Sequence, residues 1–161
     1  MTLDEMLARE SIRQTMANYT MAGDRLRTDE FVAAFTDDGI LETEGVAEED
    51  RFRYQGREAL RAWMDRWKTP PADAPVHKSS FIRHHLATSQ IELTGPQTAK
   101  ARTYWVAYTS IGPDHCGYYV DEFRKVGDSW LIAHRRIRED WRRPDSLYNQ
   151  AVSRTAIEGE R

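Results

Sequence analysis

The sequence has few of the features on which several protein classes depend. It contains a single cysteine, Cys116, which excludes an intrachain disulfide, and its five histidines show no paired metal-ligand spacing. No apolar run approaches the roughly 18 residues that a membrane span requires. The first 14 residues, MTLDEMLARESIRQ, are charged and lack the apolar centre that a signal peptide has. We therefore expect a cytoplasmic protein that binds no metal and no membrane.

The charge is also nearly balanced, with 23 Lys and Arg against 26 Asp and Glu and a net charge of -3. This balance argues against a general nucleic-acid binder, which needs a basic face for the phosphate backbone. The aromatic content argues against a disordered chain, because each of the five Trp, seven Tyr and five Phe can bury a large apolar area. The length of 161 residues fits one domain.

Helical signals fill the first part of the chain. Thr2 and Glu5 form the pattern of a capping box, and Gly23 is typical of a helix end. Thr28 can cap a second, short helix, since Asp29 and Glu30 suit its positive N-terminus. A third apolar stripe at helical spacing ends before Pro70 and Pro71. The sequence predicts helices over residues 3–22, 28–35 and 57–68.

From residue 81 the periodicity changes to that of strands, separated by short glycine-containing turns. Four strands are predicted, over residues 81–93, 99–111, 118–126 and 129–141. Gly112-Pro113 is interpreted as a turn, and His115-Cys116 is placed in the same turn region. Helices followed by hairpin-connected strands predict an α+β fold, in which a curved antiparallel sheet wraps the helices as a cone with a pocket inside. We expect this domain to span residues 1–143 and a tail to span 144–161.

The strand from Ala99 alternates small residues with larger ones, and neither of its faces is plainly polar. Both faces are therefore expected to be covered, one by helices and the other by a second subunit. This pattern predicts a homodimer or a homotrimer. Trp130, at the start of the last strand, is predicted to lie in the core.

Asp24 and two adjacent histidines are the first candidates for chemistry. Asp24 follows the helix-ending Gly23, where a solvated turn residue and a buried carboxylate are both possible. A buried Asp24 would be a better base or a partner for a histidine. His84 and His85 point to opposite faces of their strand, so at most one faces a pocket, and a satisfied core histidine is the alternative.

Arg135 shares a strand face with apolar residues and needs a partner there. An ion pair with Asp121 or a helix carboxylate is one reading, and binding of an anionic group of a substrate is the other. Aromatic side chains on the strands are candidates for a pocket lining, although a core or subunit interface also explains them. They are Tyr104, Trp105, Tyr118 and Tyr119.

Five ordered segments resemble the SnoaL-like branch of the nuclear-transport-factor-2-like superfamily. The resemblance extends from about Leu3 to Trp141 and includes a helix that ends in Tyr-x-x-x-x-Asp. The other segments are DEFVAAFTDDGILE, GREALRAWM, RHHLATSQIEL and GYYVDEFRKVGDSWLIAHRR. This superfamily has a cone-shaped α+β barrel, commonly dimeric or trimeric. It includes scytalone dehydratase, bile acid 7-alpha-dehydratase, lindane dehydrochlorinase, ketosteroid isomerase and the small subunit of ring-hydroxylating dioxygenases.

The resemblance implies that Asp24 matches the helix-end aspartate of the dehydratases and that Tyr19 matches the tyrosine of the bile acid enzyme. The downstream pattern QIEL places His84 at the histidine that pairs with this aspartate. The second histidine of scytalone dehydratase has no counterpart in residues 98–111, and the position of its serine falls at Gly117.

The resemblance therefore implies a cofactor-free lyase or isomerase that acts on a small hydrophobic, cyclic substrate. His84 would be the base, and Tyr19 would donate a hydrogen bond. His85, Tyr104, Trp105, Tyr119 and Arg135 are candidates for substrate binding. The alternative is a non-catalytic binding or scaffold protein, such as a relative of the dioxygenase small subunit.

Overall fold

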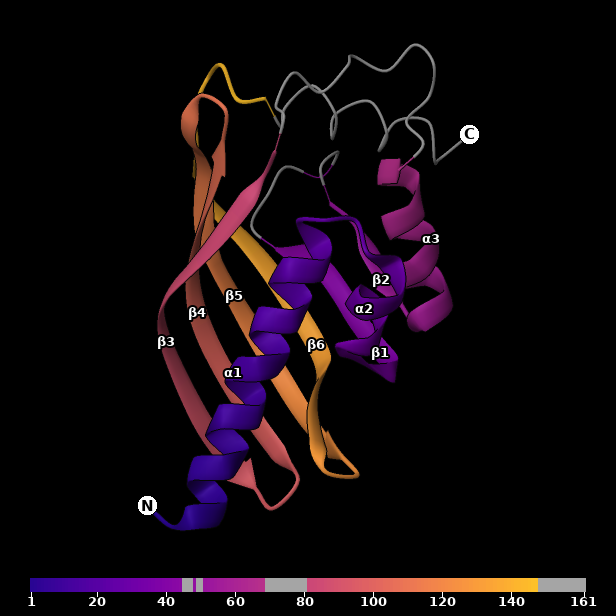
Figure 1. The fold of residues 1–161 in the computed structure, drawn as a ribbon, viewed down its shortest axis with the longest axis vertical. Coiled ribbons are helices and arrows are strands. Elements are labelled where there is room, and N and C mark those ends of the chain that lie inside the picture. The colour runs from indigo at the N-terminus through magenta and orange to yellow at the C-terminus, as the bar shows by residue number, and fades with distance from the viewer. Residues whose placement is uncertain (45–47, 49–50, 69–80, 148–161) are drawn as a thin grey trace.

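The computed structural model describes three helices and a six-stranded sheet (Figure 1). The described residues are 1–44, 48, 51–68 and 81–147. The helices are α1 (Leu3–Gly23), α2 (Thr28–Ala33) and α3 (Arg57–Lys68). The strands are β1 (Phe35–Glu44), β2 (Arg53–Gln55), β3 (Arg83–Gly95), β4 (Thr98–Thr109), β5 (Gly112–Val126) and β6 (Ser129–Arg142). No described helix is both long enough and apolar enough to cross a membrane.

The predicted α+β class is correct, and the capping box at the start of α1 is present. The Thr2 side chain accepts a hydrogen bond from the Glu5 N–H, and the Glu5 carboxylate accepts one from the Thr2 N–H. The prediction that Thr28 caps α2 is wrong, because its hydroxyl instead donates to Asp65 at 2.6 Å and so ties α2 to α3. Helix α2 also ends two residues early, since Phe35 already belongs to β1.

The strands are arranged in the order β2-β1-β6-β5-β4-β3. The antiparallel pairing predicted for the sheet holds for its hairpins, but β1 pairs with β6 in parallel. These two strands are joined by most of the chain, so no tight turn forces them to run in opposite directions. Within the described residues the sheet stays open, with β2 and β3 at its two edges.

Strand β5 is longer than predicted, and this difference changes the site. The turn after β4 lies at Ser110 and Ile111, so Gly112 and Pro113 are already in β5. Gly112 has a φ of +95°, which glycine adopts without the strain that a side chain would add. The prediction that His115 and Cys116 lie in a turn is therefore wrong, and the side chain of His115 is buried.

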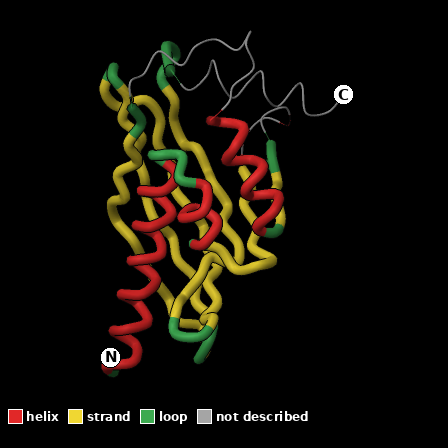
Figure 2. The backbone as a smooth tube through the Cα atoms, turned by 45° about the vertical axis from the view of Figure 1, so that its right-hand side comes forward, coloured by secondary structure: helices red, strands yellow, loops and turns green. Residues whose placement is uncertain are grey.

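The core lies between α1 and the inner face of the sheet, where the helices cover one side of the strands (Figure 2). On β4 the small residues and Trp105 point inward and are buried, while the larger residues that alternate with them are more exposed. Small side chains allow α1 to approach closely, so that the Thr103 hydroxyl reaches the Met16 sulfur at 3.6 Å. The small-large alternation of this strand thus positions α1 on the sheet.

The tail that was predicted to begin at residue 144 lies mostly outside the described residues. Its described part, 144–147, packs against β5, where the Ser146 hydroxyl donates to Asp114. Ser146 is buried. Residues 144–147 therefore pack as part of the domain.

Trp130 lies in the core, as predicted, and is only 4% exposed. Its carbonyl accepts a hydrogen bond from Thr15 at 2.6 Å, which fixes β6 against α1. Trp130→Ala is expected to lower the free energy of unfolding by about 3–5 kcal/mol, because it removes a large buried side chain. Urea unfolding measures this change. Leu7→Ala is the control, and its exposed side chain on α1 is expected to cost about 0.5 kcal/mol or less. Equal losses in the two variants would show that Trp130 is not a core residue.

Candidate active site

Asp24 and His84 meet where the end of α1 faces β3. The His84 Nδ1 lies 2.6 Å from Asp24 Oδ1, and the His84 backbone N–H donates to Asp24 Oδ2 at 3.0 Å. The Asp24 side chain is 6% exposed and that of His84 is 24% exposed. These contacts exclude the solvated-turn reading of Asp24, since both of its carboxylate oxygens are engaged by one histidine.

The hydrogen bond fixes the chemistry of the His84 imidazole. An ionised carboxylate only accepts hydrogen bonds, so Nδ1 is the nitrogen that carries the proton. The remaining nitrogen, Nε2, is then the one that can take a proton from another molecule. This is the arrangement of a general base with an orienting acid.

Arg135 is fully buried and makes an ion pair with Asp121, which is one of the alternatives that the sequence left open. Its Nε and Nη2 donate to the two carboxylate oxygens at 2.8 and 2.7 Å. The rings of Tyr19 and Tyr119 lie on the guanidinium, with both ring centroids 4.1 Å from its central carbon. Burial opposes the charge of Arg135, but the Asp121 carboxylate outweighs it and holds the pKa of Arg135 above its ordinary value.

Both of these tyrosines keep their phenolic protons at neutral pH. Burial raises the pKa of Tyr19 above 10, although the Arg135 charge lowers it in part. Burial raises the pKa of Tyr119 well above 10, and the neighbouring Tyr19 raises it further. Their hydroxyls are therefore hydrogen-bond donors. Arg135 is thus held in an ion pair with Asp121 between the two rings, and among the described residues its buried Nη1 has no hydrogen-bond partner.

Trp105 connects these groups to His84. Its ring stacks on Tyr119 with centroids 5.7 Å apart and meets His84 edge-on at 5.9 Å. Among the described residues its buried Nε1 has no hydrogen-bond partner. Of the aromatic candidates from the sequence, the structure brings Trp105, Tyr19 and Tyr119 to the Asp24–His84 pair.

His85 and Tyr104 lie on the other face of the sheet, away from Asp24. His85 is exposed and packs on Tyr108 with ring centroids 4.9 Å apart. Tyr104 is half-exposed and faces Tyr118. The expectation that these two side chains share a pocket with His84 is therefore not met, because strand alternation turns them outward.

A second histidine, His115 on β5, lies next to His84 and was not among the site residues predicted from the sequence. The two imidazole centroids are 6.0 Å apart, and Trp105 lies 5.4 Å from His115. The His115 Nδ1 is 2.8 Å from the Asp114 carboxylate. The sequence does contain a signal for this position. Once β5 is extended to Gly112, strand alternation places His115 on the same inward face as Tyr119 and Asp121.

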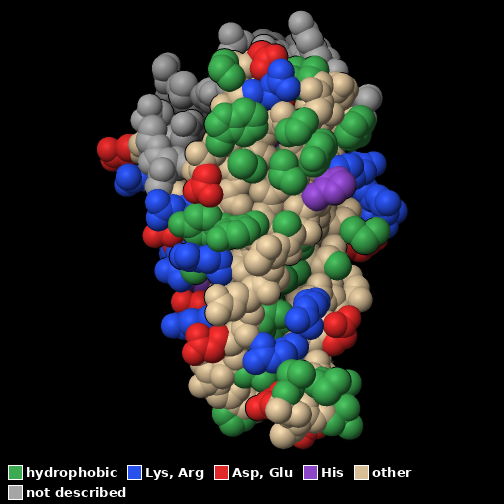
Figure 3. Space-filling model, turned by 90° about the vertical axis from the view of Figure 1, so that its left-hand side faces the viewer, with side chains coloured by type: hydrophobic (Ala, Val, Ile, Leu, Met, Phe, Trp, Pro, Cys, Tyr) green, Lys and Arg blue, Asp and Glu red, His purple; other side chains and the backbone are tan. Residues whose placement is uncertain are grey.

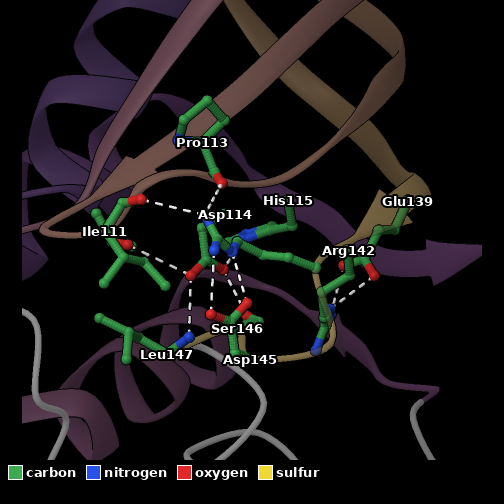
Figure 4. A network of polar contacts seen from close by, with 11 residues as sticks. Ile111, Pro113, Asp114, His115, Glu139, Arg142, Asp145, Ser146 and Leu147 are labelled. Atoms are coloured by element: carbon green, nitrogen blue, oxygen red, sulfur yellow. Dashed lines mark hydrogen bonds and ion pairs between the residues drawn. The ribbon is translucent and has the colours of Figure 1, made fainter.

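Asp114 is fully buried and is held by donors from three parts of the chain (Figure 4). Besides His115, it accepts from the hydroxyls of Ser146 and Thr109 at 2.5 and 3.3 Å and from the Leu147 N–H at 2.9 Å. Burial raises the pKa of Asp114, but the hydrogen bonds from Ser146, His115 and Leu147 outweigh it and leave that pKa below its ordinary value. Asp114 is therefore an ionised acceptor for the His115 Nδ1–H.

The described residues contain no group of three or more His, Cys, Asp or Glu side chains that could hold a metal ion. What they do contain is a set of proton-transfer groups. His84 and His115 can take or give protons, and Tyr19, Tyr119 and Trp105 can donate hydrogen bonds. This arrangement can remove a proton from a bound molecule and stabilise the charge that develops.

Comparison with known protein families adds one assignment. The model of the SnoaL-like domain matches residues 4–136. The chain belongs to the SnoaL-like family. The match spans α1 through most of β6 and therefore includes Asp24, His84, His115 and Arg135. No curated protein matches the chain.

Several solved structures share this fold. A candidate scytalone dehydratase from Novosphingobium aromaticivorans is 22% identical with a TM-score of 0.69, over 88% of this chain and 89% of that one. A hexachlorocyclohexane dehydrochlorinase from Novosphingobium barchaimii is 14% identical with a TM-score of 0.69, over 88% of this chain and 92% of that one. The beta subunit of a candidate aromatic-ring-hydroxylating dioxygenase from N. aromaticivorans is 19% identical with a TM-score of 0.69, over 92% and 97%. At these identities the similarity shows the fold alone.

The buried His115 predicts a specific pH dependence of stability. Burial lowers its pKa below 6.5, although Asp114 raises it in part, so the folded protein binds this proton less readily than the unfolded chain. The stabilisation is complete above about pH 6.5 and is lost as the pH falls below that value. The free energy of unfolding is expected to fall between about pH 7.5 and 5.5, and to fall less in His115→Asn. Urea unfolding at both pH values measures this. His85→Asn, an exposed control, is expected to keep the wild-type dependence; the same dependence in His115→Asn would contradict the assignment.

Proposed function

We propose that the protein is a cofactor-free lyase or isomerase that acts on a small hydrophobic, cyclic substrate. The observation that carries this proposal is the buried pair of Asp24 and His84, with both carboxylate oxygens bound to the histidine. A histidine that serves only the core would not need a buried carboxylate, which is costly to desolvate. Membership of the SnoaL-like family is in keeping with this chemistry.

In the proposed reaction, His84 Nε2 removes a proton from a carbon beside a carbonyl group. Asp24 keeps the imidazole oriented and stabilises the positive charge that it gains. The negative charge that develops on the carbonyl oxygen is stabilised by donors of the site, Tyr19 and Trp105. Loss of a leaving group from the next carbon, or return of the proton elsewhere, gives elimination or isomerisation. Such proton transfers need no cofactor.

The rings of Trp105 and Tyr119 supply the apolar surface for the substrate. They stack on each other and extend from His84 to the Arg135 ion pair. An apolar surrounding strengthens the hydrogen bonds made to a developing oxyanion, because water does not compete for them. This surface favours a flat or cyclic molecule over a long polar chain.

A binding or scaffold protein is the second candidate, and the similarity to the dioxygenase beta subunit favours it. In that case the same interior would hold a small molecule or only stabilise the fold. The two candidates differ in what the Asp24–His84 pair does. Loss of this pair abolishes a reaction in the first case and changes only binding or stability in the second.

Asp24→Asn is expected to keep the fold and lower the rate by about 10⁴-fold, because an amide cannot stabilise an imidazolium and favours the wrong tautomer. His84→Ala is expected to lose about as much, and the double variant little more, since the two residues act as one unit. The rates are measured on cyclic β-hydroxy ketones and hydroxy-acyl compounds after a screen with the wild type. His85→Ala, on the outer face, is the control and should stay near the wild-type rate. Near-full rates in both single variants would overturn the mechanism.

We also propose that the chain forms a homo-oligomer through the outer face of the sheet. Large side chains on this face are exposed, among them Tyr104 at 51% and Trp141 at 49%. Hydrophobic side chains gather on the face of the molecule that carries β3 (Figure 3). A second copy would cover apolar surface of a kind that monomers seldom leave open.

Light scattering is expected to give a mass of at least twice the 18.7 kDa of one chain at micromolar concentration. Replacing Tyr104 and Trp141 together by Glu should shift the mass toward the monomer, because charges would be buried at the contact. Met21→Glu, on the exposed side of α1, is the matched control and should leave the mass unchanged. A wild-type mass of 18.7 kDa would contradict the proposal.

A further inference from the structure

The turn at the end of α1, which carries Asp24, is closed by two backbone hydrogen bonds. The Arg27 N–H donates to the Ala22 carbonyl at 2.9 Å. The Leu26 N–H donates to the Gly23 carbonyl at 3.1 Å. This pair of bonds is typical of a helix end in which one residue, usually a glycine, takes the left-handed conformation. Asp24 lies between the donors and the acceptors of these bonds, so the turn sets the direction in which its side chain leaves the helix.

The left-handed residue of this turn is Leu26, with a φ of +54°. Gly23, the last residue of α1, has no positive φ. Among the described residues Leu26 is the only residue other than glycine with a positive φ. In this conformation the Cβ of leucine lies close to a backbone carbonyl, which costs free energy that a glycine would avoid. A strained residue of this kind persists only where its surroundings hold it there.

The packing of its side chain is what holds Leu26 in this conformation. The side chain is partly buried and lies against the hydrophobic core. The residues on either side of it, Arg25 and Arg27, are exposed. Glycine would relieve the backbone strain but would provide no such contact with the core. The strain at Leu26 is therefore accepted in exchange for an apolar attachment of the helix end at this point.

The group that depends on this attachment is the carboxylate of Asp24, two residues before Leu26. The Asp24 backbone N–H donates to the Thr20 carbonyl at 3.0 Å, so Asp24 still belongs to the last turn of the helix. Its carboxylate accepts hydrogen bonds from the His84 backbone N–H at 3.0 Å and from the ring Nδ1 at 2.6 Å. Hydrogen bonds weaken steeply as they depart from linear geometry. A helix end that moved would therefore misalign both bonds at once.

The segment that follows Leu26 has one further attachment. Thr28, the first residue of α2, donates from its hydroxyl to Asp65 on α3 at 2.6 Å. The connection between α1 and α2 is thus fastened at two points, through the Leu26 side chain on the core and through the Thr28 hydroxyl on α3. Leu26 is the nearer of the two to Asp24 along the chain.

We propose that Leu26 is a positioning residue of the active site, which acts through Asp24. Its side chain anchors the strained turn on the core and so keeps the Asp24 carboxylate aligned with His84 Nδ1. The effect of Leu26 on a reaction rate rests on the proposed function, in which Asp24 orients the base. Its effect on the His84 ring is a property of the folded protein and needs no substrate.

The first experiment separates the anchor from the strain by substitutions at this one position. Leu26→Ala removes the anchor and keeps the strain, whereas Leu26→Gly removes both. Leu26→Gly is therefore expected to unfold at a higher urea concentration than Leu26→Ala, although glycine ordinarily makes a helical segment less stable than alanine does. Leu26→Met keeps a flexible apolar side chain and should restore the anchor. A Leu26→Ala variant that is more stable than Leu26→Gly would show that no strain is held at this position and would overturn the proposal.

The tautomer of His84, read by ¹⁵N NMR of histidine-labelled protein, reports the anchor itself. The wild type and Leu26→Met are expected to carry the proton on Nδ1, while Leu26→Gly and Leu26→Ala show a mixture of the two tautomers. A merely structural role would make the tautomer follow stability, so that Leu26→Gly would keep more of the Nδ1–H form than Leu26→Ala. The positioning role makes it follow the side chain. Arg25→Ala, which changes an exposed side chain of the same turn, is the control and should keep the wild-type tautomer.

Rates on a substrate found for the wild type test whether Leu26 acts through Asp24. Leu26→Gly is expected to lower kcat by about 10–10²-fold with little change in KM, the loss that a misplaced catalytic group causes. In the Asp24→Asn background the same substitution should cause little further loss, because residues that act as one unit are not additive. A full additional loss in that background would show that Leu26 acts by another route.

The two proposals fail in different ways. If the wild type turns over no substrate, the proposed function fails, and the His84 tautomer alone decides on the role of Leu26. If His84 carries its proton on Nδ1 as completely in Leu26→Gly as in the wild type, the positioning role is overturned, whatever the rates show.

Discussion

The contact between Asp24 and His84 is the interaction on which the rest of the site depends. It joins the end of α1 to β3, 60 residues later in the chain, through two hydrogen bonds to one carboxylate. Because Asp24 follows the last turn of α1, the position of its carboxylate is set by how that helix packs on the sheet. The small residues of β4 allow this packing. The fold and the chemistry are therefore linked through one helix end.

Three aspartates among the described residues each hold a basic side chain in this region, and each pair has its own geometry. Asp24 holds His84, Asp114 holds His115, and Asp121 holds Arg135. Each pair satisfies its carboxylate, which reduces the cost of burying charge. The Arg135 pair is locked between two tyrosine rings and cannot exchange a proton at neutral pH. The two histidine pairs lie next to each other, with ring centroids 6.0 Å apart.

The sequence predicted the helices, the hairpins and the Asp24–His84 pair, because each has a local signal or a matched family position. It did not predict the parallel pairing of β1 with β6, since nothing in either strand specifies a partner so distant in the chain. His115 was missed because Gly112-Pro113 looked like a turn. The real turn lies two residues earlier, and this shift extends β5 and turns His115 inward. Side-chain direction thus depended on a turn position that the sequence pattern did not fix.

The most direct test of this account is the tautomer of His84, which ¹⁵N NMR of histidine-labelled protein reports. The account predicts a proton on Nδ1 and none on Nε2 in the neutral form of the wild type, because the ionised Asp24 only accepts hydrogen bonds. In Asp24→Asn this preference should be lost, since the amide can also donate to the ring. A wild-type His84 with its proton on Nε2, or a tautomer that Asp24→Asn leaves unchanged, would contradict the claim that Asp24 prepares His84 as a base.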